Sequence, residues 1–242
     1  MDIVVAQDRP DLAQEAAAAF RERWPEFIFH DEVPKRYMPR VHEYFREYDI
    51  LLLDDGKVAA GGWGVPLIWD GGPVNLPSGY DDALIRAVEG HETDHRADTL
   101  CFMAAAVATA YDKQGLAIAV LTELTERARA DGIEQVIAPV RPTWKHRYPH
   151  VPMSEYATWV REDGLSIDPW IRTHQRMGAT ILTPAVESMR IEGTVAEWEE
   201  WTGMVFPVTG DYVVPDALNL LHVDRATDHA IYCEENLWLR HH

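Results

Sequence analysis

Hydrophobic side chains recur at two spacings along the chain, and the alternation between them predicts a mixed α and β fold. Apolar residues at helical spacing predict helices over residues 10–24, 35–46, 81–91, 118–129, 169–177 and 195–201. Short apolar runs bounded by turn residues predict strands over residues 2–6, 49–53, 57–69, 98–107, 135–140 and 179–182. Residues 204–207, 212–214, 220–223 and 229–233 have the same character and predict short strands toward the end of the chain.

A Gly-bearing turn joins the strand predicted over residues 98–107 to the helix predicted over residues 118–129. A helix that begins directly after such a turn presents free backbone N–H groups and a partial positive charge to an anion. Gly115 and the small Ala117 leave room for phosphate groups to approach the backbone. The turn therefore predicts a phosphate-bearing cofactor. The alternative is an ordinary connection that binds no ligand.

The charge of the chain narrows the range of partners. Forty acidic residues against 22 basic ones give a formal net charge of −18, which argues against a nucleic-acid partner. The same charge is compatible with a cationic or amine substrate. An anionic cofactor would need local basic side chains, and the candidates are Lys113, Arg141, Lys145 and Arg147.

Length and composition predict a single large domain with a sizeable core. The chain has 242 residues, of which 47% are hydrophobic, and contains nine Trp. No apolar run is long enough to span a membrane, and the first residues lack the features of a signal peptide. Two cysteines, Cys101 and Cys233, do not form a disulfide framework. We therefore expect a cytoplasmic protein with no membrane partner. The sequence does not decide whether the chain forms a homodimer.

The segment from His91 to His95 matches H-E-x-x-H, the pattern that places two zinc-binding imidazoles one helical turn apart beside a catalytic Glu92. The surroundings disfavour this interpretation, because Gly90 precedes the motif and Asp94 occupies a position that is usually uncharged. No third ligand motif follows. Zinc hydrolysis is therefore a remote alternative, and we expect no metal.

Two ordered motifs resemble the GNAT superfamily of acyl-CoA N-acyltransferases. The central motif of that family is matched at Val107, Tyr111, Gly115 and Ala117, whereas Thr109 stands in place of the frequent Pro and Asp112 in place of the usual Arg or Gln. The later Tyr-x-x-x-Gly pattern has the same spacing at His174 and Gly178. The resemblance covers residues 1–190, which we expect to form the core. Residues 191–242 would be a β-rich C-terminal extension packed on the same domain.

The resemblance implies a mixed, splayed central sheet flanked by helices, with acetyl-CoA or another acyl-CoA held where the sheet splays. The pantetheine arm would pair with Val107, Ala108 and Thr109 in the manner of an added strand. The pyrophosphate would lie on the backbone N–H groups of Asp112, Lys113, Gln114, Gly115, Leu116 and Ala117. The amine of a small molecule would attack the thioester directly, without a covalent intermediate or a metal.

The same resemblance suggests which residues carry protons during the reaction. His174 stands where the family often has its Tyr acid, and Tyr148 is a rival for that role. Cys101 stands where some members have a Glu base, and the nearest carboxylate is Asp98. Because of Asp112 and Cys101, a non-catalytic acyl-CoA-binding or sensing protein is the alternative function.

Overall fold

A nine-stranded sheet runs through the whole structure, a computed structural model that describes residues 1–242. Its first half is an antiparallel array of β1 (Asp2–Val5), β2 (Asp49–Asp54), β3 (Lys57–Leu67) and β4 (Thr99–Val107). Next to β4 lies β5 (Gln135–Val140), which is parallel to it. These strands agree with the predicted ones to within two residues at each end.

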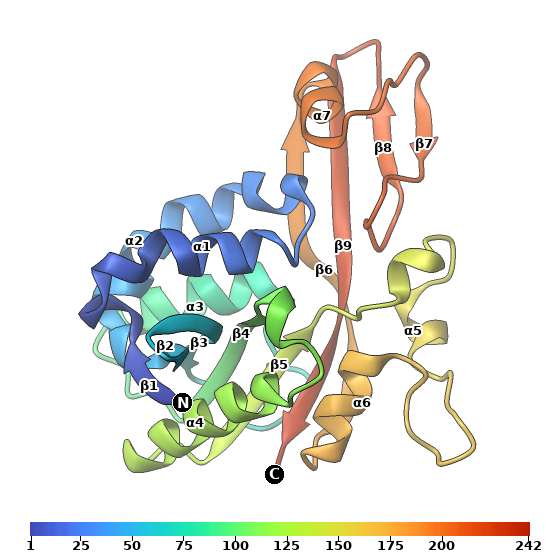
Figure 1. The fold of residues 1–242 in the computed structure, drawn as a ribbon. Helices are drawn as coiled ribbons and strands as arrows, with labels where there is room; N and C mark the ends of the chain where they lie inside the picture. Colours follow the sequence, from blue (N-terminus) through green and yellow to red (C-terminus); the bar gives the residue numbers. More distant parts are fainter.

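The second half of the sheet is organised around β9 (His229–His241). One edge of β9 pairs first with β8 (Leu221–Asp224) and then with β5, and the other edge pairs with β6 (Thr180–Gly193) along its length. Strand β7 (Gly210–Tyr212) adds to β8. Figure 1 shows β6 and β9 as a long ribbon that leaves the main body and carries β7 and β8 at its far end.

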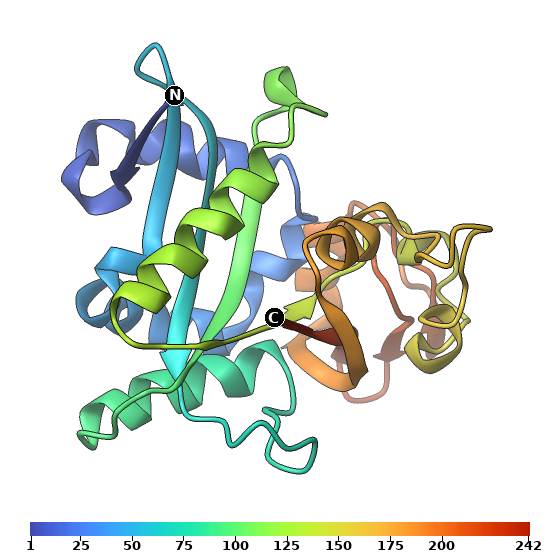
Figure 2. The ribbon, with the colours of Figure 1, turned by 90° about the horizontal axis from the view of Figure 1, so that it is seen from below.

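The helices cover both faces of the first half of the sheet. They are α1 (Ala13–Arg21), α2 (Glu32–Tyr44), α3 (Tyr80–Glu92) and α4 (Leu116–Ala130). On β3, a side chain at Gly61 would meet Phe20 of α1, whereas one at Gly62 would meet Val120 of α4. Since neighbouring residues of a strand face opposite ways, α1 and α4 lie on opposite faces. Figure 2 shows α4 crossing its face of the sheet.

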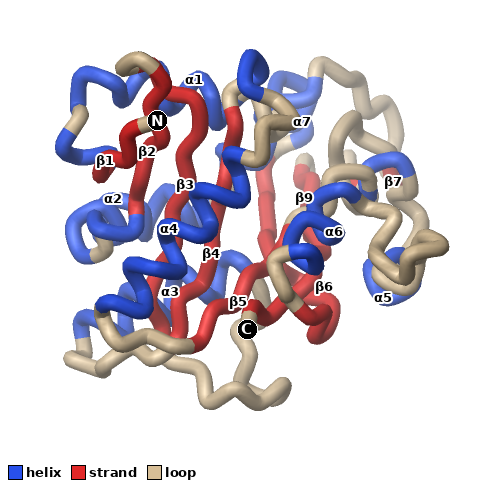
Figure 3. The backbone as a smooth tube through the Cα atoms, turned by 60° about the horizontal axis from the view of Figure 1, so that its bottom comes forward, coloured by secondary structure: helices blue, strands red, loops and turns tan.

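Strands β4 and β5 separate shortly after they begin. Their register covers only Thr99 to Cys101 on β4, so the remainder of β4 has no partner on β5 (Figure 3). The sheet is therefore open and splayed, as predicted. The short helix α6 (Pro169–Arg176) stands beside the split, and α5 (Met153–Tyr156) lies farther out.

The sheet joins two large, separate hydrophobic cores, besides a small cluster of four buried residues around Leu12 and Leu51. The larger contains 39 buried residues of the main body, and the smaller contains 11, including Phe27, Trp198 and Tyr232. The smaller core, which we call the second lobe, lies between the ends of β6 and β9, the strand β8 and helix α7 (Val195–Thr202). Phe27 belongs to the loop between α1 and α2, so that loop is fixed on the second lobe.

The strands of the second half differ from the sequence-based expectation in two respects. Residues 204–207 form no strand, and both β6 and β9 are much longer than the predicted segments. The expected boundary after residue 190 falls inside β6. The last strand, β9, fills a position beside β5, so the final 50 residues complete the sheet. No helix has the length and apolar character that a membrane span requires.

Candidate functional site

A large cavity of about 1050 Å³ lies between the main body and the second lobe, where β4 and β5 separate. The unpaired part of β4 forms one wall, and the end of β5 with helix α6 forms another. The loop after α1 and the polar middle of β9 complete the enclosure. A volume of this size suits an extended ligand together with a second small molecule.

The turn before α4 carries free backbone N–H groups of the kind that an anion site requires. The backbone N–H groups of residues 113–117 make no hydrogen bond within the protein. Gly115 is the N-terminal cap residue of α4 and has a φ of 78°, the left-handed conformation that glycine adopts without strain. All residues of the turn from Asp112 to Ala117 line the cavity. Five free donors at the positive end of a 15-residue helix fit a diphosphate.

Arg23 of the α1–α2 loop neutralises the carboxylate that Asp112 brings to this turn. Its Nη2 lies 2.6 Å from Oδ1 of Asp112, and its Nε donates to the carbonyl oxygen of Val107 at 2.8 Å. Arg23 thereby compensates the negative charge of Asp112, the residue that departs from the family motif. The Arg23 side chain also occupies the carbonyl group of Val107 on β4, which the pantetheine arm was expected to use.

His174 lines the cavity, as the sequence predicts, but it is almost completely buried and is linked to a second histidine. Its Nδ1 lies 2.8 Å from Nε2 of His241, and its own Nε2 has no partner. Burial lowers the pKa of His174 to about 3 and that of His241 to about 4. Both rings are therefore neutral at pH 7, which excludes an imidazolium at His174 as the resting proton donor.

Tyr148 and Asp98 do not line the cavity. The Tyr148 ring packs against Tyr156 and Trp159 on the outer side of α5. The Asp98 carboxylate accepts from the backbone N–H of Trp69 at 2.9 Å at the start of β4. Cys101 does not line the cavity either and is fully buried, which raises the pKa of its thiol. The structure thus brings together His174 and the turn, but not the other proposed proton carriers.

Two aromatic residues that the sequence reasoning missed line the cavity beside the polar wall. Tyr80, the first residue of α3, packs its ring edge-on against Trp63 of β3 at 6.3 Å. Its hydroxyl group makes no hydrogen bond within the protein, and burial raises the pKa of the phenol. Gly79 precedes it and presses against β6, since a Cβ there would lie 2.1 Å from the Cα of Ser188. Nothing local in the sequence marks Tyr80 as a cavity residue.

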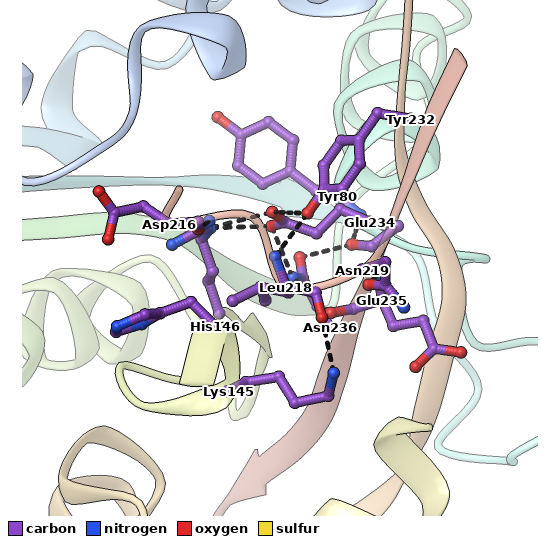
Figure 4. Close-up of polar contacts among 12 residues, drawn as sticks. Tyr80, Lys145, His146, Asp216, Leu218, Asn219, Tyr232, Glu234, Glu235 and Asn236 are labelled. Carbon is purple, nitrogen blue, oxygen red and sulfur yellow. Dashed lines mark hydrogen bonds and ion pairs between the residues drawn. The ribbon is translucent and has the colours of Figure 1, made fainter. Parts of the chain in front are cut away.

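A fully buried carboxylate, Glu234 of β9, is the centre of the polar wall (Figure 4). It accepts hydrogen bonds from Nε of Arg141 at 3.0 Å, from the hydroxyl of Tyr232 at 2.9 Å and from the amide of Asn236 at 3.0 Å. Asn236 in turn accepts from the hydroxyl of Ser188 at 2.7 Å. The wall is therefore a connected hydrogen-bond network in which each of these groups has a partner.

The H-E-x-x-H segment lacks the geometry of a zinc protease. Helix α3 ends at Glu92, and Asp94 has a φ of 54°, so His91 and His95 do not lie on one helical face. Glu92 pairs with Arg40 at 2.9 Å, and His91 stacks on Tyr44. No group of three or more His, Cys, Asp or Glu side chains is arranged to hold a metal ion. The zinc-hydrolase alternative is therefore not favoured.

No protein-family model matches the chain. A relative from Aspergillus versicolor, named arginine N-acetyltransferase avaD, is 28% identical over 269 residues, which cover 98% of this chain and 92% of the relative. Among solved structures, the loading GNATL domain of CurA from Lyngbya majuscula matches with a TM-score of 0.63 and 17% identity, over 99% of this chain and 96% of that one. The GphF GNAT-like decarboxylase in complex with isobutyryl-CoA matches at 0.62 and 16% identity, over 100% and 98%.

Proposed function

We propose that the chain is a GNAT-type acyl-CoA N-acyltransferase that transfers an acetyl group from acetyl-CoA to a nitrogen of arginine or of a closely similar small cationic molecule. The free N–H groups of residues 113–117 at the mouth of a cavity of about 1050 Å³ carry this proposal, since they fit the diphosphate of the cofactor. The relative that acetylates arginine extends along 98% of the chain, which supports the acceptor. The net charge of −18 favours a cation over an anion.

In this proposal, the acceptor nitrogen attacks the thioester carbonyl carbon, the C–S bond breaks, and the departing thiolate takes up a proton. Residues 107–109 and 112–117 hold the cofactor. The proton that the acceptor nitrogen loses passes to Nε2 of His174 and from there to the departing thiolate, so His174 ends the reaction neutral while its Nδ1 stays hydrogen-bonded to Nε2 of His241. This scheme suits a buried pair with lowered pKa values. Tyr148 and Asp98 have no part in it, because they lie outside the cavity.

Two unpaired cysteines, Cys101 and Cys233, are compatible with a reducing compartment, and a cytoplasmic location is part of the proposal.

The test is an assay of the purified protein with acetyl-CoA and a panel of amines, including arginine, lysine and agmatine. Release of free thiol gives the rate, and mass spectrometry identifies the acetylated product. We expect an acetylated product from arginine. Binding of acetyl-CoA without turnover for any amine would support the sensing alternative. The absence of acetyl-CoA binding would contradict the assignment of the turn.

A further inference from the structure

We infer that Arg141 holds the carboxylate of the acceptor, so that the preferred acceptor is an amino acid and not the amine formed by its decarboxylation. The inference deepens the proposed function and rests on it. Arg141 directly follows β5, at the end of that strand which borders the cavity, and its side chain is 19% exposed. Two arginines, Arg23 and Arg141, line the cavity. Arg141 is the one whose carboxylate partner is fully buried, and one of its terminal nitrogens has no hydrogen-bond partner.

The guanidinium of Arg141 is fixed on two sides. Its Nε donates to both oxygens of Glu234, at 3.0 and 3.1 Å, and its Nη2 donates to the carbonyl oxygen of Asp216 at 2.7 Å. Asp216 has a φ of 63°, which turns its backbone toward the arginine side chain. Figure 4 shows Glu234 and Asp216 on opposite sides of the site. These contacts leave Nη1 without a partner, and it carries two N–H donors.

The carboxylate that holds Arg141 in place is itself held by further hydrogen bonds. Glu234 is fully buried and is itself fixed by Tyr232 and Asn236. A buried ion pair rarely adds net stability over an apolar substitute, because both charges lose their hydration. A rigid guanidinium at the wall of a cavity is, however, what the recognition of a planar anion requires. The network is therefore better explained by binding than by folding.

A carboxylate fits the site better than a phosphate. Glu234 places a negative charge beside the guanidinium, and this charge repels a dianionic phosphate about twice as strongly as a carboxylate. The cavity already has a separate phosphate site at residues 113–117. The phosphates of the cofactor nevertheless share this chemistry, and the experiment has to separate them from the acceptor.

The experiment compares amino acids with their decarboxylated amines in pairs: arginine with agmatine, lysine with cadaverine, and tryptophan with tryptamine. For the best pair, we expect kcat/KM for the amino acid to exceed that for the amine by at least about tenfold, the contribution of one charge-assisted hydrogen-bond pair. Equal values for acid and amine in every pair would overturn the inference while leaving acyl transfer to amines intact.

The variant Arg141→Lys keeps a cation beside Glu234 but removes the planar fork, and Arg141→Met combined with Glu234→Gln removes the anchor without leaving a lone buried charge. In both variants, the ratio of kcat/KM for the amino acid to kcat/KM for the amine should fall toward one. Arg161→Met, which changes an exposed arginine outside the cavity, is the matched control and should keep the parental ratio. A variant that weakens acetyl-CoA binding more than it lowers this ratio would assign Arg141 to a cofactor phosphate and overturn the inference.

If no amine of the panel reacts, the proposed acyl transfer fails, and the anchor is then judged by binding alone. Calorimetric titration of the CoA-saturated protein with the same pairs provides this measurement. Binding of an amino acid but not of its amine, abolished in Arg141→Lys, retains the anchor. Equal binding within each pair, or no binding at all, overturns it.

Discussion

The guanidinium of Arg23 lies 2.6 Å from the carboxylate of Asp112, although the two residues are 89 positions apart in the chain. The contact connects the α1–α2 loop to the turn that carries the free N–H groups. It removes the electrostatic objection that a carboxylate at Asp112 raises against a phosphate ligand. It also ties the loop that lines one wall of the cavity to the turn before α4, which lines the same cavity.

Loss of this pair should weaken cofactor binding. Arg23→Met leaves Asp112 unpaired near the phosphates, and we expect acetyl-CoA to bind about three- to tenfold more weakly, as partly exposed charges allow. Calorimetric titration measures the change. The double variant Arg23→Met with Asp112→Asn should recover most of it. If the double variant binds as weakly as the single one, the effect comes from the lost contact with Val107 and not from charge.

The conformation of Gly115 gives a second prediction. A β-branched residue at a φ of 78° is strained by roughly 1–2 kcal/mol, so Gly115→Val should distort the turn and weaken acetyl-CoA binding by about five- to thirtyfold. Gly164→Val is the matched control, because Gly164 has a φ of 77° with the same open space around it and lies outside the cavity. Equal acetyl-CoA binding by both variants would remove the turn from the cofactor site. Circular dichroism checks that the fold persists in each.

The histidine pair gives a third prediction, on the rate. If His174 delivers the proton to the thiolate, His174→Gln should lower kcat by about 100-fold, the usual loss for an acid catalyst, while the Kd of acetyl-CoA changes less than about threefold. His241→Phe should lower kcat in the same direction but by less, because His174 remains. A parental kcat in His174→Gln would transfer the role to another donor, and Tyr80, which also lines the cavity, is a candidate.

The pair of His174 and His241 should make the free energy of unfolding depend on pH in the acid range. The ordinary pKa of histidine is 6.5, and in the folded protein burial lowers it to about 3 for His174 and to about 4 for His241. As the pH falls below 6.5, the unfolded chain takes up protons that the folded protein does not, so the free energy of unfolding falls. At pH 4.5 each ring contributes a loss on the order of 2 kcal/mol. Urea unfolding at pH 7 and pH 4.5 measures this loss.

Substitution of one ring tests the origin of that slope. His174→Gln should show a smaller loss of stability between pH 7 and pH 4.5 than the parent. His222→Gln is the control, since His222 is exposed and pairs with Asp211 at the surface. An unchanged slope in His174→Gln would mean that other groups take up the protons.

The order of the first five strands and the Gly-bearing turn could be predicted from the sequence, because both depend on local patterns. Strands β6 and β9 were predicted too short, because Ser188, Glu234 and Asn236 interrupt their apolar pattern. Glu234 and Asn236 line the cavity, and Ser188 donates a hydrogen bond to Asn236, so the apolar pattern fails at the site itself.

Contacts between residues that lie far apart in the chain could not be predicted from the sequence. His174 could be selected by its motif, but its partner His241 is 67 positions away, and its neutral state follows from burial. Tyr148 and Asp98 were chosen by their nearness to predicted strand ends. The structure turns one outward onto α5 and places the other at the far end of β4.

The ribbon of β6 and β9 also determines how wide the cavity is. Its register shifts between Ala185 and Met189, at the level of the polar wall and between the two hydrophobic cores. Such an irregularity bends and twists a strand pair. The angle between the two lobes is thus set by a few backbone positions, some of which contact no ligand. Insertions or substitutions there offer natural selection, or a protein engineer, a way to change the size of accepted molecules without altering the chemical groups that recognise them.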